Sequence, residues 1–341
     1  MKYNKFSNLL KILPNNEIVI ENLAKVYLIR KNFPLAEKHL IKLIQLSKEN
    51  VKKIIPLILG YSYEGNEKQY KKICKLFIKN LTRDSSKFSL NLKKNKLPKI
   101  SFLSPDIRNH PVGFFIKDML PELSKRFEVI IFNTSEFEDE ISLYAKKFCQ
   151  WINVQAKNEY EIADIIFRKK VDVLVDSSGL TRTNNLGVFK LKPSNNQVSW
   201  AGWLASTNLK EMDYVISDNF CTQKKDEKFF TEKILRMKNI WCTYSLSVLE
   251  NLNLKKENNS EPFIIYGCFQ RPEKITKKVL TTWMDILKRV KKSKIFFINQ
   301  SFHEYERNRI IFHFNKNGVS SKRLTFIPVS YTHLRAHETP C

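Results

Sequence analysis

The chain has 341 residues, 43% of them hydrophobic and only 8 of them glycine, which predicts two or three packed domains and excludes disorder and fibrous repeats. Its net charge of +25 is densest in residues 1–99, where 22 Lys and Arg stand against 7 Asp and Glu. Because no nucleic-acid motif accompanies this charge, we favour solvated helix faces over a surface for nucleic acid, anionic lipid or acidic proteins. No apolar run approaches the roughly 20 residues that span a bilayer and no cleavage site follows the N-terminus, so we expect a cytoplasmic protein without a membrane span.

Residues 1–90 carry helical periodicity with few breaks. Ala24, Tyr27, Ala36 and Leu40 are spaced as in a tetratricopeptide (TPR) repeat, where small residues let two antiparallel helices approach. A weaker copy follows, with Gly60, Tyr63, Tyr70, Cys74 and Phe77. The segment therefore resembles TPR hairpins, and an ordinary pair of helical hairpins remains the alternative.

A Lys- and Asn-rich stretch, residues 91–98, ends this pattern and is interpreted as a linker, since Pro98 disfavours helix in the residue before it. Beyond it, short apolar runs alternate with amphipathic segments, which is typical of a parallel sheet covered on both faces. The expected strands are 100–103, 127–132, 171–175, 197–200 and 214–217, and the expected helices are 112–126, 138–148 and 159–169. Residues 99–250 are thus predicted to form one Rossmann-like α/β lobe.

A second α/β lobe is expected to begin at residue 262 and run to residue 330. Its expected strands are 263–268, 294–299 and 323–328, and its expected helices are 276–291 and 302–317. Three parallel strands bury little and leave exposed edges, so we expect the natural lobe to be larger. Residues 331–341 lack the Lys- and Asn-rich character of the rest, and we expect them to be a non-native tail.

The cysteines give no sign of a metal site or a disulfide framework. None forms a CxxC pair or stands at metal-ligand spacing from histidine, and a chain of this size does not need disulfides. We therefore expect reduced thiols at Cys74, Cys149, Cys221, Cys242, Cys268 and Cys341.

The first segment with candidate catalytic or binding residues follows the expected strand 100–103. Asp106, Arg108 and His110 lie in a loop at a strand's carboxyl end, which is where α/β enzymes bind ligands. Pro111 places the His110 imidazole just before a helix, where it can take a proton from a hydroxyl or simply cap the turn. The sequence alone leaves both roles open.

Two further loops carry small polar or aromatic groups. Asp176 and Thr181 follow the strand 171–175; Asp176 can orient a sugar hydroxyl or stabilise a turn, and its spacing favours the turn. Trp200 and Trp203 flank Ala201 and Gly202, which suits either a wall for a sugar or core packing at a seam between domains.

The last segment, residues 267–275, opens the second lobe. Arg271 and Lys274 lie three residues apart in a loop between a strand and a helix, which suits an anionic diphosphate at the helix N-terminus. Surface charge in a Lys-rich chain is the alternative. No Gly-rich phosphate loop is present.

Together these segments resemble the signatures of the SPINDLY/O-GlcNAc transferase family, glycosyltransferase family 41. The matching segments are residues 104–113, 171–181, 197–217 and 269–275, and the resemblance spans about residues 15–330. It implies a GT-B architecture of two Rossmann-like lobes. It also implies inverting transfer of N-acetylglucosamine from UDP-GlcNAc to Ser or Thr hydroxyls of a protein acceptor, without a metal or other cofactor.

The resemblance also implies roles for single residues. His110 would lie beside the acceptor hydroxyl as base or orienting group, and Lys274 would stabilise the leaving UDP. Arg271 would contact the donor, and Asn22 would line the TPR groove and hold the acceptor backbone. The remaining acceptor or sugar contacts would come from Asp106, Asp176, Thr181 and Trp203.

The sequence also departs from the family pattern. Leu180 stands where many members carry His or Tyr, and Gln270 replaces the usual Asn. Because the family's donor pocket would continue beyond residue 330, we expect weak UDP binding and little or no turnover by the chain as given. The alternatives are another nucleotide-sugar transferase with a non-protein acceptor and a non-catalytic TPR interaction protein.

Overall fold

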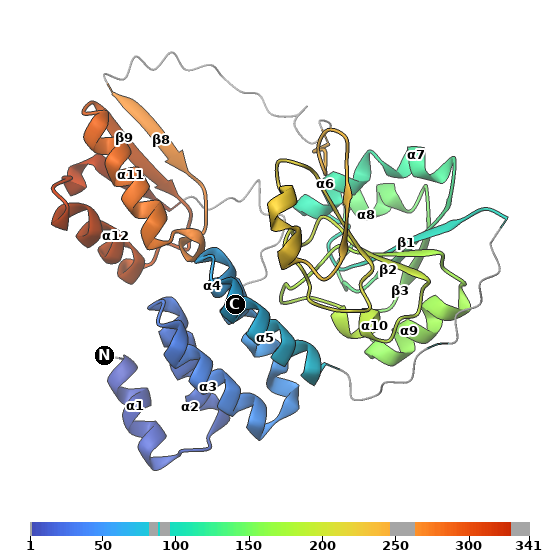
Figure 1. Cartoon of the computed structure of the whole chain (residues 1–341), viewed down its shortest axis with the longest axis horizontal. Helices are drawn as coiled ribbons and strands as arrows, with labels where there is room; N and C mark the ends of the chain where they lie inside the picture. Colours follow the sequence, from blue (N-terminus) through green and yellow to red (C-terminus); the bar gives the residue numbers. More distant parts are fainter. Residues whose placement is uncertain (1, 82–87, 89–95, 246–262, 329–341) are drawn as a thin grey trace. The chain divides into compact units, whose positions relative to one another are not determined.

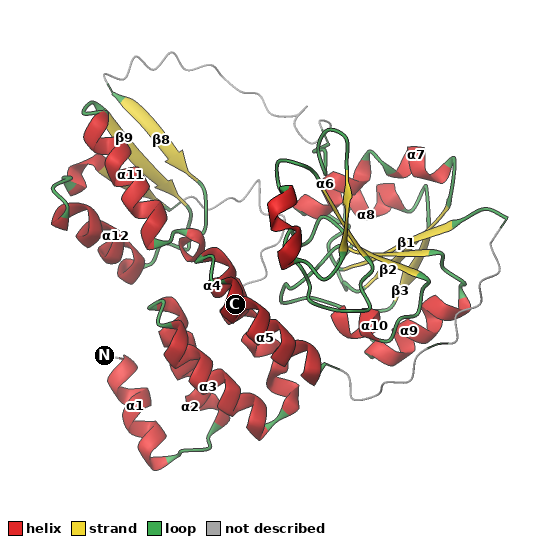
Figure 2. Ribbon diagram, viewed as in Figure 1, coloured by secondary structure: helices red, strands yellow, loops and turns green. Residues whose placement is uncertain are grey.

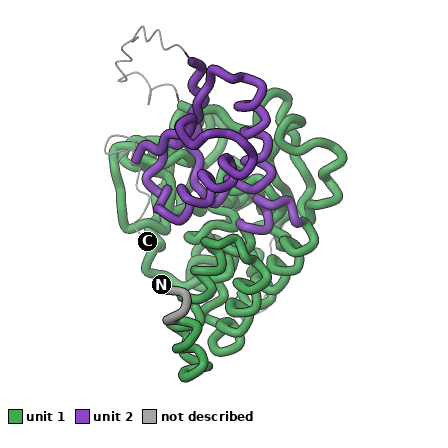
Figure 3. The backbone as a smooth tube through the Cα atoms, turned by 90° about the vertical axis from the view of Figure 1, so that its left-hand side faces the viewer, with its two compact units in different colours: residues 1–59, 67–252, 336–341 green, residues 60–66, 253–335 purple. Residues whose placement is uncertain are grey.

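The computed structural model (Figure 1) describes residues 2–81, 88, 96–245 and 263–328. The chain forms two compact units, which Figure 3 distinguishes. Of the described residues, the first unit comprises 2–59, 67–81, 88 and 96–245, and the second comprises 60–66 and 263–328. Among the described residues, no helix is long and apolar enough to cross a membrane.

The N-terminal part is helical, as the sequence predicts. Its elements are α1 (Lys2–Ile12), α2 (Glu17–Ile29), α3 (Phe33–Leu46), a 3₁₀ helix (Lys48–Ile54), α4 (Ile55–Tyr63) and α5 (Glu67–Asn80). Asn16 and Asn32 begin α2 and α3, because each side-chain oxygen accepts a hydrogen bond from a backbone N–H of the first turn. Ala24 and Ala36 are fully buried where α2 packs against α3, so these small residues do allow close approach.

The first unit also contains a seven-stranded sheet in which every strand pair is parallel (Figure 2). The strand order is β3-β2-β1-β4-β5-β6-β7. The strands are β1 (Lys99–Ser104), β2 (Glu128–Asn133), β3 (Gln150–Asn153), β4 (Val173–Asp176), β5 (Asn196–Ser199), β6 (Tyr214–Ser217) and β7 (Lys233–Arg236). The five predicted strands are confirmed, and the two edge strands, β3 and β7, were not predicted.

The helices of this lobe are shorter than the sequence suggests. They are α6 (Pro111–Lys117), α7 (Leu120–Ser124), α8 (Glu140–Ala145), α9 (Glu159–Arg168) and α10 (Leu186–Lys190). The prediction of one helix over residues 112–126 is wrong, because α6 ends at Lys117 and α7 begins at Leu120. Pro121 explains the break, since it lacks an N–H and its ring would clash with the carbonyl of Lys117 in a continuous helix.

The second unit is a smaller parallel α/β structure that matches the prediction closely. It contains β8 (Ile264–Cys268), α11 (Lys277–Arg289), β9 (Ser293–Ile298), α12 (Glu304–Lys316) and β10 (Leu324–Ile327), with the strand order β10-β9-β8. Phe297, Phe302 and Phe314 are fully buried in its core. The expected non-native tail, residues 331–341, lies outside the described residues.

Helix α5 is bound to the α/β lobe of its own unit by side chains at both ends. The Tyr70 hydroxyl donates a hydrogen bond to the Ser206 carbonyl (2.5 Å) and accepts one from the Trp203 indole N–H (3.2 Å). At the C-terminus of α5, the Lys190 ammonium donates to the carbonyls of Ile78 and Leu81 at 2.8 Å each. Because a cation is favoured at a helix C-terminus, Lys190 both caps α5 and holds it on the lobe.

Candidate functional site

The strand order places two loops side by side at the carboxyl edge of the large sheet. β1 pairs with β2 on one side and with β4 on the other, and Leu103 is the register partner of Asp176. The chain therefore leaves β1 and β4 in opposite directions, and the crevice beyond such a switch point is where open α/β sheets bind ligands. The loops concerned, residues 105–110 and 177–185, are two of the three that the sequence singled out in this lobe.

The loop after β1 is anchored to neighbouring elements by hydrogen bonds. The Ser104 hydroxyl accepts from the Asp106 N–H at 3.1 Å, within the loop itself. From α8 and its N-cap, Asp139 accepts from the Asn109 N–H (2.5 Å), and the Ser142 hydroxyl donates to the Ile107 carbonyl (3.1 Å). The loop is thus held in one shape before any ligand arrives.

His110 is the N-cap of α6, as its position before Pro111 predicts. Its Nδ1 accepts a hydrogen bond from the Val112 N–H at 3.3 Å. A neutral imidazole that accepts at Nδ1 carries its proton on Nε2. The cap therefore fixes which ring nitrogen can donate.

Arg108 belongs to this loop and is buried, with 8% of its surface exposed. Its guanidinium donates to the Pro105 carbonyl (3.1 Å) and lies 3.6 Å from the Asp106 carboxylate. Its Nη1 is buried and has no hydrogen-bond partner within the described part of the chain. Asp106 is thus placed at the candidate site as the partner of a buried cation, and its contact with an acceptor or sugar stays a prediction.

Asp176 forms the turn that its spacing favours. Its carboxylate accepts hydrogen bonds from the N–H groups of Ser178 (3.0 Å) and Gly179 (3.0 and 3.2 Å), and its side chain has no exposed surface. Gly179 adopts a positive φ of 56°, and a Cβ there would lie 2.1 Å from the Cβ of Trp203. The carboxylate therefore shapes the loop and does not reach its surface.

Burial raises the pKa of the Asp176 carboxyl to about 6, against the hydrogen bonds from Ser178 and Gly179, and the nearby Glu232 raises it further. A raised pKa in the folded state gives stability that is fully present below the unfolded value of 3.8 and is lost as the pH rises through about 6. A tenfold change in proton affinity between the two states corresponds to about 1.4 kcal/mol. Between pH 4.5 and pH 7.5, Asp176 is therefore expected to lower the unfolding free energy of the wild type by about 2 kcal/mol. Asp176→Asn is expected to lack this fall.

Urea denaturation of the wild type and of Asp176→Asn from about pH 4.5 to about pH 7.5 measures this difference in unfolding free energy. Asp218→Asn is the matched control, because Asp218 also accepts backbone N–H groups in a turn after a strand, and these bonds lower the pKa of its carboxyl. A lowered pKa changes the unfolding free energy mainly below about pH 4.5. Asp218→Asn therefore leaves the slope of unfolding free energy against pH unchanged between about pH 4.5 and pH 7.5. A slope unaltered in Asp176→Asn would contradict the raised pKa.

Three hydroxyls in the loop after β4 are buried without a hydrogen-bond partner in the described residues. They belong to Ser177, Ser178 and Thr181. Trp203 lies half-buried against Gly179 and donates to Tyr70, so it joins this loop to helix α5. The predicted contacts of Thr181 and Trp203 with an acceptor or sugar stay predictions, whereas their place beside the switch point is observed.

The predicted donor-binding residues lie in the second unit. Arg271 and Lys274 are exposed in the turn between β8 and α11, and Lys274 Nζ lies 6.0 Å from the ring centroid of Tyr63, a residue of the same unit. Thr276 caps α11 by accepting from the Val279 N–H. His110 belongs to the other unit, so its convergence with Lys274 stays a prediction.

Asn22 lies partly exposed on α2, and its amide donates to the Ile18 carbonyl of the same helix at 2.9 Å. Its predicted role in a groove for the acceptor backbone is untested. No group of three or more His, Cys, Asp or Glu side chains that could hold a metal ion occurs among the described residues, and metal independence stays a prediction.

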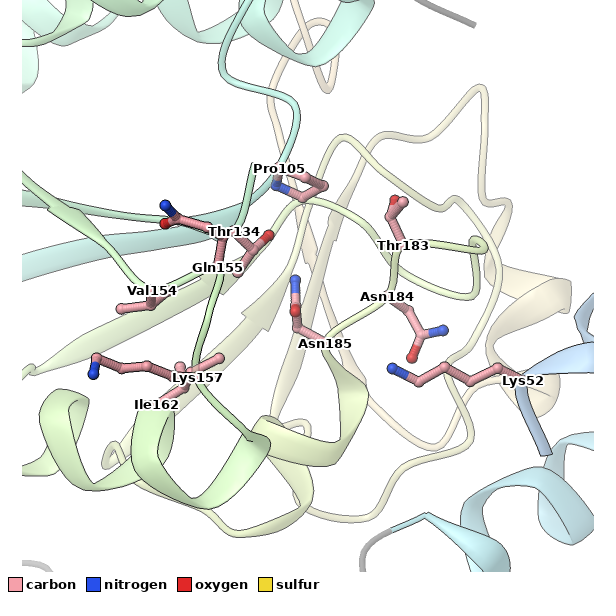
Figure 4. Close-up of a pocket in the computed structure, with 10 residues that line it drawn as sticks. All are labelled: Lys52, Pro105, Thr134, Val154, Gln155, Lys157, Ile162, Thr183, Asn184 and Asn185. Atoms are coloured by element: carbon pink, nitrogen blue, oxygen red, sulfur yellow. The ribbon is translucent and has the colours of Figure 1, made fainter. Parts of the chain in front are cut away.

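The structure also contains a pocket that the sequence did not indicate (Figure 4). Its volume is about 240 Å³, and it lies at the carboxyl edge of the large sheet, next to the two loops described above. It is lined by Lys52, Pro105, Thr134, Val154, Gln155, Lys157, Ile162, Thr183, Asn184 and Asn185. These residues come from six separate stretches of the sequence, so no local sequence motif predicts the pocket.

The chain has the architecture of a class of proteins that carry helical hairpins ahead of parallel α/β units. An O-GlcNAc transferase from Thermobaculum terrenum has a similar fold, with a TM-score of 0.66 and 18% identity over 95% of this chain and 70% of that chain. Within that class the chain belongs to glycosyl transferase family 41, whose profile matches residues 62–246. The match includes α5 and both loops at the switch point.

Curated relatives support the same assignment. The chain is 28% identical over 261 residues to a probable UDP-N-acetylglucosamine–peptide N-acetylglucosaminyltransferase SPINDLY of Arabidopsis thaliana, which covers 72% of this chain and 28% of the relative. It is 26% identical over 288 residues to the protein of that description from Solanum lycopersicum, covering 81% of this chain and 30% of the relative. The chain thus spans less than a third of the length of these relatives.

Proposed function

We propose that the protein transfers N-acetylglucosamine from UDP-GlcNAc to Ser or Thr hydroxyls of proteins, by inversion and without a metal. The observation that carries the proposal is the position of His110. It caps α6 at the β1–β4 switch point, inside the segment that the family profile matches. The family membership and the relatives' names support the donor and the protein acceptor.

The proposed chemistry is a single displacement. The acceptor hydroxyl oxygen attacks the anomeric carbon and its proton passes to water or to the leaving diphosphate, while the bond from that carbon to UDP breaks and UDP leaves with the electron pair. Arg271 and Lys274 are suited to the diphosphate, because both are exposed cations in the turn that precedes the 13-residue helix α11. Their charge would stabilise the leaving group in the place of a metal ion.

A GT-B arrangement, in which the carboxyl edges of the two sheets border one cleft, is part of the proposal. The strands of each sheet are parallel, as the two Rossmann-like lobes of a GT-B architecture require. The protein acceptor would approach along the helical hairpins, with Asn22 holding its backbone. Because α5 is bound to the catalytic lobe through Tyr70 and Lys190, an acceptor held by the helices would be held in register with His110.

The test begins with reading the source DNA downstream of the Pro328 codon. Both the 341-residue chain and the product of any longer reading frame are then assayed for addition of N-acetylhexosamine to Ser peptides, by mass spectrometry. We expect transfer by a product that completes the donor lobe, and weak UDP binding with little turnover by the 341-residue chain. The double variant His110→Ala with Lys274→Ala is expected to abolish transfer, and Lys288→Ala, an exposed lysine in the last turn of α11, serves as its control.

Each alternative gives a different result in this assay. Survival of transfer in the double variant contradicts the two assigned roles. Transfer of a different sugar, or onto a non-peptide acceptor, contradicts the substrates, and binding of peptides without any transfer identifies a non-catalytic interaction protein. Robust turnover by the 341-residue chain contradicts the expected weakness of its donor site.

A further inference from the structure

The pocket of about 240 Å³ is built by the carboxyl ends of four adjacent strands. Pro105 follows β1, Thr134 follows β2, Val154 follows β3, and Asn185 ends the loop between β4 and α10. Lys52 reaches the same space from the 3₁₀ helix of the helical part (Figure 4). The pocket therefore lies where the helical hairpins meet the catalytic loops within the first unit.

Its polar lining is rich in hydrogen-bond donors. Seven lining residues have polar side chains, namely Lys52, Lys157, Gln155, Asn184, Asn185, Thr134 and Thr183, and Figure 4 shows the Lys157 ammonium turned away from Lys52. No carboxylate is among the lining residues. Such a lining has more donors than acceptors and a positive charge, which favours a ligand rich in acceptors and negatively charged.

Two of these polar groups lack a partner. Thr134 Oγ1 and Asn185 Nδ2 are buried and make no hydrogen bond within the described part of the chain. Figure 4 shows both side chains turned toward the same space. The neighbouring Asn184 differs, because its amide donates to the Thr181 carbonyl at 2.8 Å and its oxygen accepts from the Leu186 N–H. Buried polar groups in proteins are normally paired, so a guest with acceptor atoms would complete the pocket.

Glu159 places a carboxylate beside the pocket. Glu159 Oε1 lies 3.7 Å from Lys52 Nζ, and the same carboxylate lies over the Cα of Gly187, where a Cβ would be 1.9 Å away. Lys157 is exposed just ahead of α9, on the other side of the pocket. Glu159 therefore partly neutralises Lys52, and the exposed Lys157 adds a second positive charge near the pocket.

We propose that this pocket binds a small oxyanion, a carboxylate or phosphate group, that the peptide acceptor carries near its modified residue. The assignment of the oxyanion to the acceptor rests on the proposed function, whereas the binding of an oxyanion does not. Pro105 belongs to the same loop as His110, and Thr183 to the same loop as Thr181. An acceptor that passes from the helical hairpins to His110 would run beside the pocket.

The oxyanion itself is tested with inorganic phosphate, titrated calorimetrically into the 341-residue protein. Thr134→Val keeps the shape of the side chain and removes its hydroxyl, and Lys52→Met removes one ammonium group. Each variant is expected to weaken phosphate binding by about fivefold or more. Lys48→Met is the matched control, because Lys48 is exposed on the same 3₁₀ helix and does not line the pocket, and its effect should stay below about twofold.

The source of the oxyanion is tested with peptides that contain one Ser and differ only in a flanking Glu, Gln or phosphoserine. Tighter binding of the Glu and phosphoserine peptides, lost in Thr134→Val and Lys52→Met, supports the proposal. Binding of phosphate without any preference among the peptides overturns the acceptor assignment and identifies a site for a free anion. No phosphate binding, or an equal loss in Lys48→Met, overturns the site itself. None of these measurements uses a nucleotide sugar, so they stand whether or not transfer from UDP-GlcNAc is observed.

Discussion

In a product that completes the donor lobe, replacing His110 by alanine is expected to lower the kcat of transfer about 100-fold while leaving the pH dependence of the remaining rate unchanged. The reason is the cap on α6. The Val112 N–H donates to Nδ1, so that nitrogen must keep its lone pair and the ring must stay neutral for the cap to persist. Nε2 then carries the proton, and we predict that it would act as a hydrogen-bond donor that orients the reacting groups.

A general base would require the opposite state of the ring. To take a proton from the acceptor hydroxyl, Nε2 would need a free lone pair, which places the proton on Nδ1 and breaks the bond from Val112. On this hydrogen bond we base the prediction of an orienting donor, and the choice between the two roles that the sequence left open stays a prediction. The magnitude of about 100-fold is that of removing one such donor from a developing charge.

The measurement is the pH–rate profile of the wild type and of two variants. His110→Asn is the informative second variant, because Asn is an effective N-cap and keeps an acceptor for the Val112 N–H. It should retain the thermal stability of the wild type and lose nearly as much activity as His110→Ala. An acidic limb that is present in the wild type and absent from both variants would show that His110 acts as the base instead.

The central strands β2 and β4 were predictable because each contains an uninterrupted apolar run, residues 129–132 and 173–175. Phe132 in β2 and Leu174 in β4 are fully buried, as expected for strands covered on both faces. The edge strands β3 and β7 have no buried residue, and each has only one neighbouring strand. Four such residues give too little periodicity to separate a strand from a loop.

The candidate site was predictable in position and not in its connections. Parallel strands bring their carboxyl ends to one edge, so the loops with His110 and Asp176 were expected there. The contact from Asp139 to Asn109 spans 30 residues, and that from Trp203 to Tyr70 spans 133. Interactions over such separations leave no local pattern, and the pocket around Thr134 and Asn185 arises from the same kind of assembly.

Gly113→Ala is expected to lower the free energy of unfolding by about 3 kcal/mol and to displace His110 from the candidate site. A Cβ at residue 113 would lie 1.9 Å from the Arg108 carbonyl oxygen and 2.9 Å from the Arg108 nitrogen. Both atoms belong to the backbone of the loop that carries His110, so no side-chain rotation relieves the clash. The Arg108 carbonyl also accepts the His110 N–H at 2.6 Å, and moving it would break that bond.

Gly65→Ala separates this effect from the general cost of adding a methyl group to a glycine. Gly65 has a φ of 69°, and a Cβ there would have no atom within 4 Å, so its replacement costs backbone strain alone, about 1 kcal/mol. Urea denaturation gives the unfolding free energies, and the transfer assay reports the loss of the His110 geometry. Equal destabilisation by the two substitutions would mean that the loop yields to the added methyl group, and the rigid placement of His110 by its own loop would then be wrong.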